Sequence, residues 1–443
     1  MNIGTKKSGL AVTEIIELVN TALDGVDHRL VSHGLRVGMI SHKMLCMLGE
    51  ENPLYLQDAF MAALLHDVGA YKTDDINKMV VFESRQIWEH SLYGYLFLRK
   101  FSPLAHMAQA VLYHHLDFAH MGHLPPKIAR LAQVLHLCDR VDVYLQSDKD
   151  ASVLRRNLDK ESGTRFDPEL VELFWQADEE CGFTTLPFDQ WQVELCMESW
   201  VSAYKLQTYL EMVVSMIDFK SNFTVTHSIT TQTISVELAQ YMGLPEEEIQ
   251  QIWLGSLLHD VGKLYVPVSV VEHPGRLDAQ QLATMRKHVD GTRKVLEGKI
   301  PDEVLEIACR HHEKLNGSGY PRGLSAPELN MAQRIVCVAD ITSALSCERS
   351  YKPAFSREKT QALLDRMTIA GELDAGVVQV LYQNYEAIQK KVKLATQEVQ
   401  ATYNKLMNAY EILMEKRQQM SIEEWLMLLD GYVTQGYSVL QQA

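Results

Sequence analysis

The sequence predicts an all-α protein with two tandem helical bundle domains and a C-terminal helical extension. Apolar residues recur at spacings of three and four along most of the chain, as at Ile335, Val338 and Ala339, which is the periodicity of a helix with one buried face. No alternating run of apolar and polar residues is long enough to indicate a strand. The third observation is internal repetition, because residues 13–200 and 206–390 carry the same residue types in the same order.

The repeated unit is marked by histidine and aspartate residues. Each copy contains the segment Leu-Leu-His-Asp-Val-Gly, at residues 64–69 and again at residues 257–262. Each copy then has an isolated histidine, a His-His pair and an aspartate on an apolar helix, and each has one further histidine upstream. In chain order these residues are His33, His66, Asp67, His90, His114, His115 and Asp139 in the first copy, and His227, His259, Asp260, His288, His311, His312 and Asp340 in the second.

Local signals place the other elements of the two copies. Pro245 and the glutamates after it suit a helix N-terminus, where proline is tolerated and negative charge is favourable. Residues 162–175 close the first copy, and residues 370–382 are their counterpart in the second. Residues 183–192, which contain Gly, Pro and Thr, are the predicted inter-domain turn, and a helix over residues 200–218 leads into the second domain.

The sequence changes character after Tyr385. Apolar residues from Ile388 to Leu413 keep a three-four spacing with polar residues between them, which predicts a long amphipathic helix. Residues 421–424 form a possible capping box that starts another short helix. This extension either packs against its own chain or forms a homodimer. We therefore expect a first domain over residues 1–200, a second over residues 201–390 and an extension over residues 391–443.

Composition limits the class of protein. The chain has 443 residues, of which 47% are hydrophobic, so it can bury more than one core. Its net charge of −15 argues against a nucleic-acid polymer as partner, because such binders usually present a basic face. The seven cysteines include no Cys-x-x-Cys pair and read as reduced, buried thiols. With no signal-peptide core and no apolar run long enough for a bilayer, we expect a soluble cytoplasmic protein without a membrane partner.

A Gly-rich loop follows the second His-His pair directly. Residues 311–321 read HHEKLNGSGYP, and this segment cannot continue as a helix. Gly317 and Gly319 permit backbone angles that other residues avoid, and Pro321 stiffens the end of the loop. Such a loop can bring main-chain N–H groups close to an anion such as a phosphate.

The ordered histidines and aspartates together with this loop resemble the HD-GYP family of metal-dependent cyclic-dinucleotide phosphodiesterases. The resemblance is close over residues 206–385 and looser over residues 13–200. It implies two HD-type helical domains and hydrolysis of cyclic di-GMP or 3′3′-cyclic GMP-AMP to a linear dinucleotide or mononucleotides. Two divalent ions about 3.5–4 Å apart can activate a bridging water for this reaction and neutralise charge at phosphorus.

The resemblance also assigns roles to residues of the second copy. It implies that His227, His259 and Asp340 hold one ion, that His288, His311 and His312 hold the other, and that Asp260 bridges them. Iron and manganese are the ions that the family most often uses, and mixed nitrogen and oxygen donors suit such metals. Lys263 matches a family lysine that protonates the leaving oxygen or holds phosphate. Residues expected at the substrate are Arg349, Lys352, Gly319 and Tyr320.

Three residues of the second copy depart from the family pattern. Asn316 stands where an aspartate is usual, and it should change only the hydrogen bonding of the loop. Ser343 replaces an aspartate three residues after Asp340, which puts the position of Lys263 and the rate in doubt. Phe223 stands where some members carry a glutamate that helps to bind a third ion, so the sequence favours a two-ion site.

The first copy keeps every ligand type but lacks other parts of the pattern. Ala70 stands where Lys263 stands in the second copy, and Leu116 stands where Glu313 stands. No GYP sequence follows His115, and Lys72 is the nearest substitute for the missing lysine. We therefore expect a regulatory or scaffolding domain with a possible second metal site at His33, His66, Asp67, His90, His114, His115 and Asp139.

Two other functions remain open from the sequence. One is a non-catalytic receptor or signalling scaffold that binds a cyclic dinucleotide, which the departures at Asn316 and Ser343 would allow. The other is a nucleotide phosphohydrolase of the wider HD superfamily, against which the GYP segment argues.

Overall fold

The protein is described here by a computed structural model that covers residues 11–24, 31–71, 81, 88–147, 150–198, 202–220, 225–273, 275–346 and 355–439. Helices form its regular secondary structure, and these ranges contain no β-strand beyond two isolated bridges. The all-α prediction is therefore confirmed. Residues of the sequence analysis that lie outside the described ranges are Lys72, Phe223, Cys347, Arg349 and Lys352.

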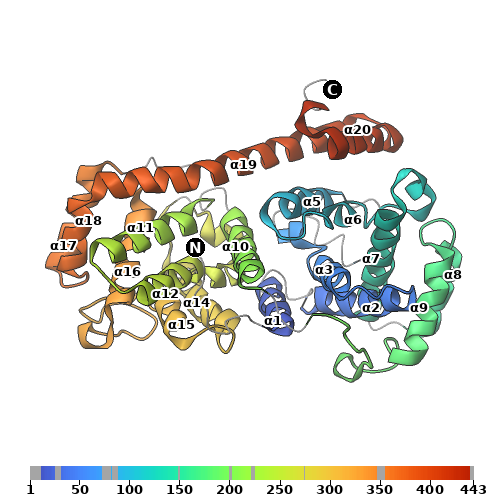
Figure 1. The fold of residues 1–443 in the computed structure, drawn as a ribbon, viewed down its shortest axis with the longest axis horizontal. Coiled ribbons are helices and arrows are strands. Elements are labelled where there is room, and N and C mark those ends of the chain that lie inside the picture. Colours follow the sequence, from blue (N-terminus) through green and yellow to red (C-terminus); the bar gives the residue numbers. More distant parts are fainter. Residues whose placement is uncertain are drawn as a thin grey trace. The chain divides into compact units, whose positions relative to one another are not determined.

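The chain folds into two compact units (Figure 1). The first unit consists mainly of Asp27–Lys205 and Asn404–Ala443, and the second mainly of Leu206–Tyr403. Residues 391–443, expected as a separate extension, are thus divided between the two units at a point inside one long helix.

The first unit contains the first copy of the repeat and part of the C-terminal extension. Three of its helices have a side-chain N-cap, because Asn52, Asp150 and Asp167 each accept hydrogen bonds from backbone N–H groups of the first helical turn. Its elements are α2 (His33–Met47), α3 (Pro53–Leu64), η2 (Val68–Tyr71), α5 (Glu89–Phe101), α6 (Ala108–Leu112), η3 (Phe118–His123), α7 (Pro126–Leu145), α8 (Ala151–Glu161), α9 (Pro168–Cys181), η4 (Phe188–Gln190), α20 (Ile422–Gln435) and η7 (Gly436–Val439). Helix α1 (Val12–Leu23) precedes them.

The second unit contains the second copy, and α10 is the helix expected to lead into it. Its helices α11, α12 and α16 surround a core that includes Ile234, Ile252 and Ile335, all fully buried. Its elements are α10 (Ala203–Lys220), α11 (His227–Tyr241), α12 (Glu246–Leu258), η5 (Val261–Tyr265), α13 (Val268–Val271), α14 (Ala279–Leu296), α15 (Asp302–Cys309), η6 (Ala326–Glu328), α16 (Met331–Ser346), α17 (Arg357–Ile369), α18 (Ala375–Gln383) and the first part of α19 (Tyr385–Gln419).

Both units arrange their key residues on matching elements. A helix begins at the upstream histidine, the next helix ends just before the His-Asp pair, and a short 3-10 helix follows. The isolated histidine then lies on α5 or α14, the His-His pair follows α6 or α15, and the last aspartate lies on α7 or α16. The duplication seen in the sequence is therefore a duplication of structure.

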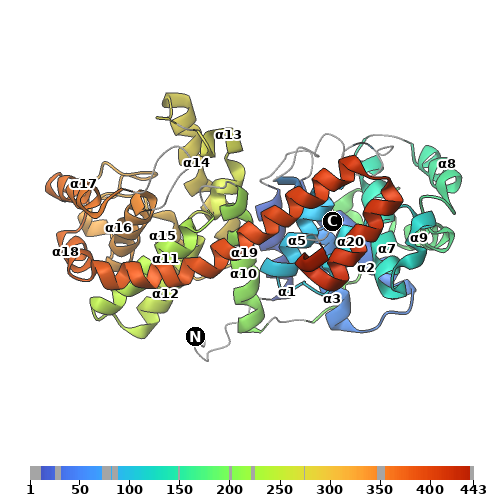
Figure 2. The ribbon, with the colours of Figure 1, turned by 90° about the horizontal axis from the view of Figure 1, so that it is seen from above.

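The end of the chain packs on the first unit. Figure 2 shows α20 over α5, and the contacts agree, because the indole ring of Trp425 lies 4.9 Å from that of Trp88. Trp425 is fully buried and donates from Nε1 to the carbonyl oxygen of Leu413 at 2.8 Å. The capping box at Ser421 and Glu424 is present. These contacts match the alternative in which the extension packs on its own chain, and homodimer formation stays a prediction.

No helix within the described ranges has both the length and the apolar character that crossing a bilayer would need.

Candidate metal centre

Seven side chains of the second unit meet in one place, and we call them the second cluster. They come from the start of α11, the end of α12, the middle of α14, the turn after α15 and the middle of α16. Six of the seven are buried, whereas the side chain of His312 keeps 24% of its surface exposed. The second cluster is His227, His259, Asp260, His288, His311, His312 and Asp340, the set that the sequence analysis named.

A glycine allows two of these elements to approach. A Cβ atom added at Gly262 would lie 1.9 Å from the carbonyl oxygen of His288, so no other residue fits there without a shift. Thr292 fixes the same contact, because its Oγ1 accepts from the N–H of Gly262 at 3.0 Å and donates to the carbonyl oxygen of His259 at 2.9 Å. The Gly of the His-Asp-x-Gly motif therefore holds Asp260 beside α14.

Hydrogen bonds also aim the imidazole rings. Nδ1 of His259, of His288 and of His311 each lies 2.6–2.7 Å from the carbonyl oxygen three residues earlier in the chain. Because a carbonyl oxygen can only accept, Nδ1 carries the proton and Nε2 keeps its lone pair. His227 instead has Nδ1 at 3.0 Å from Oγ of Ser343. These partners turn the free nitrogens toward the middle of the cluster, as around a metal ion.

Asp260 lies between two groups of imidazoles. Its Oδ2 is 3.2 Å from Nε2 of His227 and 3.2 Å from Nε2 of His259. Its Oδ1 faces the other group, at 3.5 Å from Nε2 of His288 and 4.0 Å from Nε2 of His311. One carboxylate thus offers one oxygen to each group, which is the geometry that a bridging ligand needs.

Asp340 also reaches both groups. Its Oδ1 lies 3.3 Å from Nε2 of His227 and 3.7 Å from Nε2 of His259. Its Oδ2 lies 3.6 Å from Nδ1 of His312, on the other side. The resemblance placed Asp340 with the first of these groups alone, whereas its position in the structure also permits a contact with an ion in the second.

Charge states differ among the residues of the metal-free cluster. Burial alone would lower the pKa of His227, but hydrogen bonds to Asp260 and Asp340 outweigh it and raise the pKa to about 10, so this ring must release a proton before it can bind a metal. Burial and the neighbouring His259 lower the pKa of His311 to about 3, so this ring is neutral. Burial would raise the pKa of Asp260, but His259 and Lys263 hold it well below its usual value. Neutral imidazoles and ionised carboxylates are the forms that bind metals.

The donor set fits divalent transition metals. Ring nitrogens of His288, His311 and His312 lie within 4.8 Å of one another, close enough to share one ion. Imidazole nitrogens mixed with carboxylate oxygens suit iron, manganese and zinc more than magnesium or calcium. The ligands identified from the sequence therefore form a cluster that could hold metal.

The loop after His312 is held by Glu313, a fully buried carboxylate. Glu313 accepts from the N–H of Arg322 at 2.7 Å and from the N–H of Leu324 at 2.9 Å. The N–H groups of Gly317, Ser318 and Tyr320 also donate to oxygens of the loop or its base. These hydrogen bonds stabilise the loop internally, and the Glu313 carboxylate accepts from the two N–H groups just beyond it, whereas phosphate binding by the loop stays a prediction.

Two expected features of the loop are visible in its packing. A Cβ atom at Gly319 would lie 2.4 Å from the backbone nitrogen of Lys314, which explains the glycine. Asn316 accepts from the N–H of Ser318 at 3.0 Å and donates to the carbonyl oxygen of Ala370 at 3.0 Å. Its departure from the family aspartate therefore concerns loop hydrogen bonding, as expected.

Tyr320 forms one wall of the cluster. Its ring lies 4.7 Å from the ring of His312, and the guanidinium carbon of Arg286, on α14, lies 4.8 Å from the centre of the Tyr320 ring. The sequence analysis did not identify Arg286. The sequence gave only a weak indication of its place at the site, because Arg286 is a cation two residues before His288 of the cluster. Lys263, which was identified, lies against the carboxylate of Asp260. Arg349 and Lys352 lie outside the described residues.

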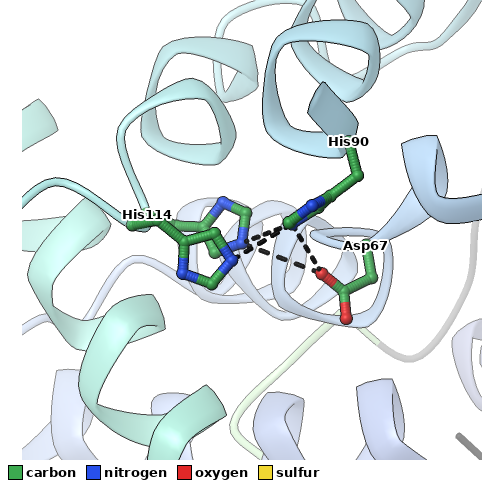
Figure 3. A group of neighbouring side chains, drawn as sticks. Asp67, His90 and His114 are labelled. Atoms are coloured by element: carbon green, nitrogen blue, oxygen red, sulfur yellow. Dashed lines mark hydrogen bonds and ion pairs between the residues drawn. The ribbon is translucent and has the colours of Figure 1, made fainter. Parts of the chain in front are cut away.

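The first unit holds an equivalent group of side chains, which we call the first cluster. Figure 3 shows Asp67, His90 and His114 converging from separate elements. Oδ1 of Asp67 lies 3.2 Å from Nε2 of His90, and Oδ2 lies 3.4 Å from Nε2 of His33 and 3.3 Å from Nε2 of His66. Asp67 therefore lies between two groups of imidazoles, as Asp260 does. The first cluster is His33, His66, Asp67, His90, His114, His115 and Asp139.

Two family models match the chain, and both are described as HD domain. One matches residues 30–144 and the other matches residues 211–377.

The chain carries two HD domains.

The chain is similar to proteins named as cyclic-dinucleotide phosphodiesterases. The 3′3′-cGAMP-specific phosphodiesterase 1 of Vibrio cholerae is 28% identical over 387 residues, which is 82% of this chain and 89% of that protein. The cyclic di-GMP phosphodiesterase PA4108 of Pseudomonas aeruginosa is 29% identical over 148 residues, 32% of this chain and 36% of that protein. A crystal structure of a cyclic GMP-AMP specific phosphodiesterase from V. cholerae shares the fold, with a TM-score of 0.55 and 21% identity, and covers 86% of this chain and 98% of its own.

The first HD domain differs from the second around its last aspartate. Arg140 is buried and binds both carboxylate oxygens of Asp139, with Nε at 2.9 Å from Oδ2 and Nη2 at 2.8 Å from Oδ1. The second HD domain has Ile341 at this position. A second buried carboxylate lies nearby. Asp142 accepts hydrogen bonds from Nδ1 of His33 at 2.7 Å and from Nε of Arg36 at 2.6 Å. The first HD domain thus supplies its own cations to its carboxylates.

These pairs were missed in the sequence although they left a signal. Residues 136–145 read HLCDRVDVYL, a helix that is apolar except for its charged residues. All of α7 from Leu131 to Tyr144 is buried, so charges there must find partners within the fold. A buried helix with Asp, Arg and Asp in four residues therefore predicts ion pairs, but the sequence does not say with which residues.

Proposed function

We propose that the second HD domain is a metal-dependent phosphodiesterase that hydrolyses a cyclic dinucleotide, with 3′3′-cyclic GMP-AMP and cyclic di-GMP as the two candidate substrates. The main support for this proposal is the position of Asp260. Its two carboxylate oxygens face two separate groups of imidazoles beside the GYP loop. The named activities of the relatives support the substrate class. The match over 89% of the cyclic GMP-AMP phosphodiesterase supports that substrate as the first candidate.

We further propose two divalent ions, iron or manganese, in the second cluster. His227, His259 and Asp340 would hold one ion, His288, His311 and His312 the other, and Asp260 both. Two such ions, when bound, supply an activated water as nucleophile and neutralise charge on the phosphate. Oδ2 of Asp340 lies close enough to His312 to complete the second set as well.

The remaining residues of the site would orient the substrate and move its proton. Lys263 lies at the carboxylate of Asp260, where its ammonium group can approach a phosphate oxygen and protonate the leaving oxygen. Arg286 lies over the ring of Tyr320 at the exposed side of His312, where a guanidinium can bind a phosphate. Ser343 keeps the ring of His227 oriented through Nδ1. Gly319 and Tyr320 would shape the pocket, and Arg349 and Lys352 would bind the phosphates.

For the first HD domain we propose a regulatory or structural role with metal bound at the first cluster. Its ligands are present and close, since donor atoms of Asp67, His90, His114 and His115 lie within 4.8 Å of one another. It lacks a counterpart of Lys263, because Ala70 is at that position and is buried. A closed site without a cation for the leaving group is suited to structural metal binding rather than to catalysis.

Hydrolysis of both cyclic dinucleotides by protein loaded with manganese or iron tests the proposal. We expect cyclic GMP-AMP to be converted to a linear dinucleotide or mononucleotides, and Asp260→Asn to abolish conversion. Tight binding of either substrate with no product from fully loaded protein would contradict the proposal and favour a receptor.

A further inference from the structure

A third group of potential ligands lies in the first unit, apart from the first cluster. His42 and Cys46 are four residues apart on α2, so they share one face of that helix. Cys196 comes from the segment 191–198, which has no helix or strand. The two Sγ atoms and a ring nitrogen of His42 all lie within 4.8 Å of one another.

The contacts show which atoms face the centre of this group. Nε2 of His42 lies 3.6 Å from Sγ of Cys46 and accepts from the backbone N–H of Cys196 at 2.9 Å. His42 itself is fully buried, and its ring packs edge-on against Phe60. The buried ring thus has Nε2 beside the Cys46 thiol and the backbone of Cys196, and a ring nitrogen lies within 4.8 Å of both Sγ atoms.

We propose that His42, Cys46 and Cys196 bind a zinc-class divalent ion. Two thiolates and one imidazole are a common zinc donor set, and a fourth position is completed by water in open sites. The charges balance, since the ion displaces one proton from each thiol and the resulting complex is neutral. When the ion binds Nε2 of His42, the backbone N–H of Cys196 loses its hydrogen bond to that nitrogen. It can donate to water instead, because Cys196 is exposed.

Exposure separates this group from the other described cysteines. Cys46 is partly exposed and Cys196 is exposed, whereas Cys138, Cys181, Cys309 and Cys337 are buried. An ion can therefore reach the site from solvent. The expectation of buried thiols holds for the last four residues and is wrong for Cys196.

The ion would fasten an irregular segment to the helix that carries His33. Within residues 191–198, the backbone N–H groups with a partner in the described part of the fold are those of Trp191, bonded to Phe188, of Gln192, bonded to Cys181, and of Cys196, bonded to His42. Most side chains of the segment are exposed, so little apolar burial holds it in place. Three coordinate bonds at Cys196, Cys46 and His42 would add the missing anchor.

Cobalt spectroscopy of the full chain, without a histidine tag and fully reduced, tests this proposal. Thiolate ligands give cobalt(II) a strong near-ultraviolet charge-transfer band, and both HD clusters offer only nitrogen and oxygen donors. We expect the band to saturate at one cobalt per chain and to disappear when zinc is added. Cys46→Ser and Cys196→Ser should abolish it, whereas Cys309→Ala and Cys347→Ala should retain it.

Three results would overturn the proposal. The first is the absence of the charge-transfer band in the wild-type chain, and the second is a band that survives in Cys196→Ser. The third is a Cys46–Cys196 disulfide that forms in preference to metal binding when zinc is present. Turnover of cyclic dinucleotides is measured in the same samples. Because this site is separate from the second cluster, loss of the cobalt band with turnover intact is expected for both serine variants.

Discussion

The two HD domains present the same ligands in different surroundings. In both, one aspartate lies between two groups of imidazoles, and in both a glycine closes the gap to the next helix, since a Cβ atom at Gly69 would lie 2.1 Å from the carbonyl oxygen of His90. Around this shared centre, the first domain buries Arg140 against Asp139, whereas the second keeps Lys263, Glu313 and a partly exposed His312.

This difference separates two requirements of a metal enzyme. Binding a metal needs donor atoms in the right positions, and both domains supply them. Turning over a phosphodiester also needs an open side for substrate and a cation near that side that can reach the phosphate. On the proposed division of labour, a complete set of ligands does not by itself indicate catalysis, because the neighbouring charges differ.

The largest expected effect comes from replacing the central aspartates one at a time. Asp260→Asn should lower turnover by more than about 10³-fold, because one carboxylate serves both ions. Asp67→Asn should leave turnover within about threefold of wild type if folding is intact. Steady-state rates measure both effects, with circular dichroism as the folding control. Equal losses of turnover in the two variants would contradict the proposal that only the second domain is catalytic.

A smaller effect is expected at Arg286. Removing a charged phosphate contact costs about 1.5–3 kcal/mol, so Arg286→Ala should raise KM about 10- to 100-fold with little change in kcat. Arg286→Lys should recover part of the loss. Lys287→Ala removes an exposed cation on the same helix and is the matched control. A loss confined to kcat would show that Arg286 does not act in binding.

Arg140 should matter for stability rather than for turnover. Breaking a buried ion pair leaves Asp139 with an uncompensated charge, so Arg140→Met should destabilise the metal-free first domain by about 3–5 kcal/mol. The double variant Arg140→Met with Asp139→Asn should recover much of this loss. Urea unfolding of metal-free protein measures it, and a single variant as stable as wild type would refute the assigned role.

The smallest expected effect is the part of the pH dependence of folding stability that His136 contributes in the first domain. Burial, Arg165 and Arg140 hold the pKa of His136 well below its usual value of 6.5. The unfolded chain therefore binds a proton that the folded chain does not, so stability is present above pH 6.5 and is lost as the pH falls below it. His136→Gln should weaken this loss between pH 7 and pH 5. An equal loss of stability in wild type and His136→Gln would show that other buried histidines with a lowered pKa, such as His311 in the second domain, account for it.

The sequence was sufficient for the fold and for the residues that meet in the two clusters, and the reason is local. Helical periodicity, caps such as Ser421 and the glycine of the His-Asp-x-Gly motif act within a few residues, so their patterns can be recognised along the chain. The order of histidines and aspartates identified both clusters. The second cluster could also be ranked above the first, because the lysine and the GYP loop follow it directly.

The remaining features depend on pairs of residues far apart in the chain. Cys196 meets His42 across 154 positions, and Asp430 meets Tyr113 across 317. Neither partner has a distinctive neighbourhood in the sequence. The Gly-rich pattern indicated N–H groups close to an anion, but it did not indicate that the Glu313 carboxylate would accept from the N–H groups of Arg322 and Leu324.

The positions of the metal ions in the second HD domain test the central claim most directly. Anomalous diffraction from crystals of manganese-loaded protein would locate them. We expect two peaks about 3.5–4 Å apart, one beside each oxygen of Asp260. A single peak, or two peaks that do not share Asp260, would contradict the proposed mechanism.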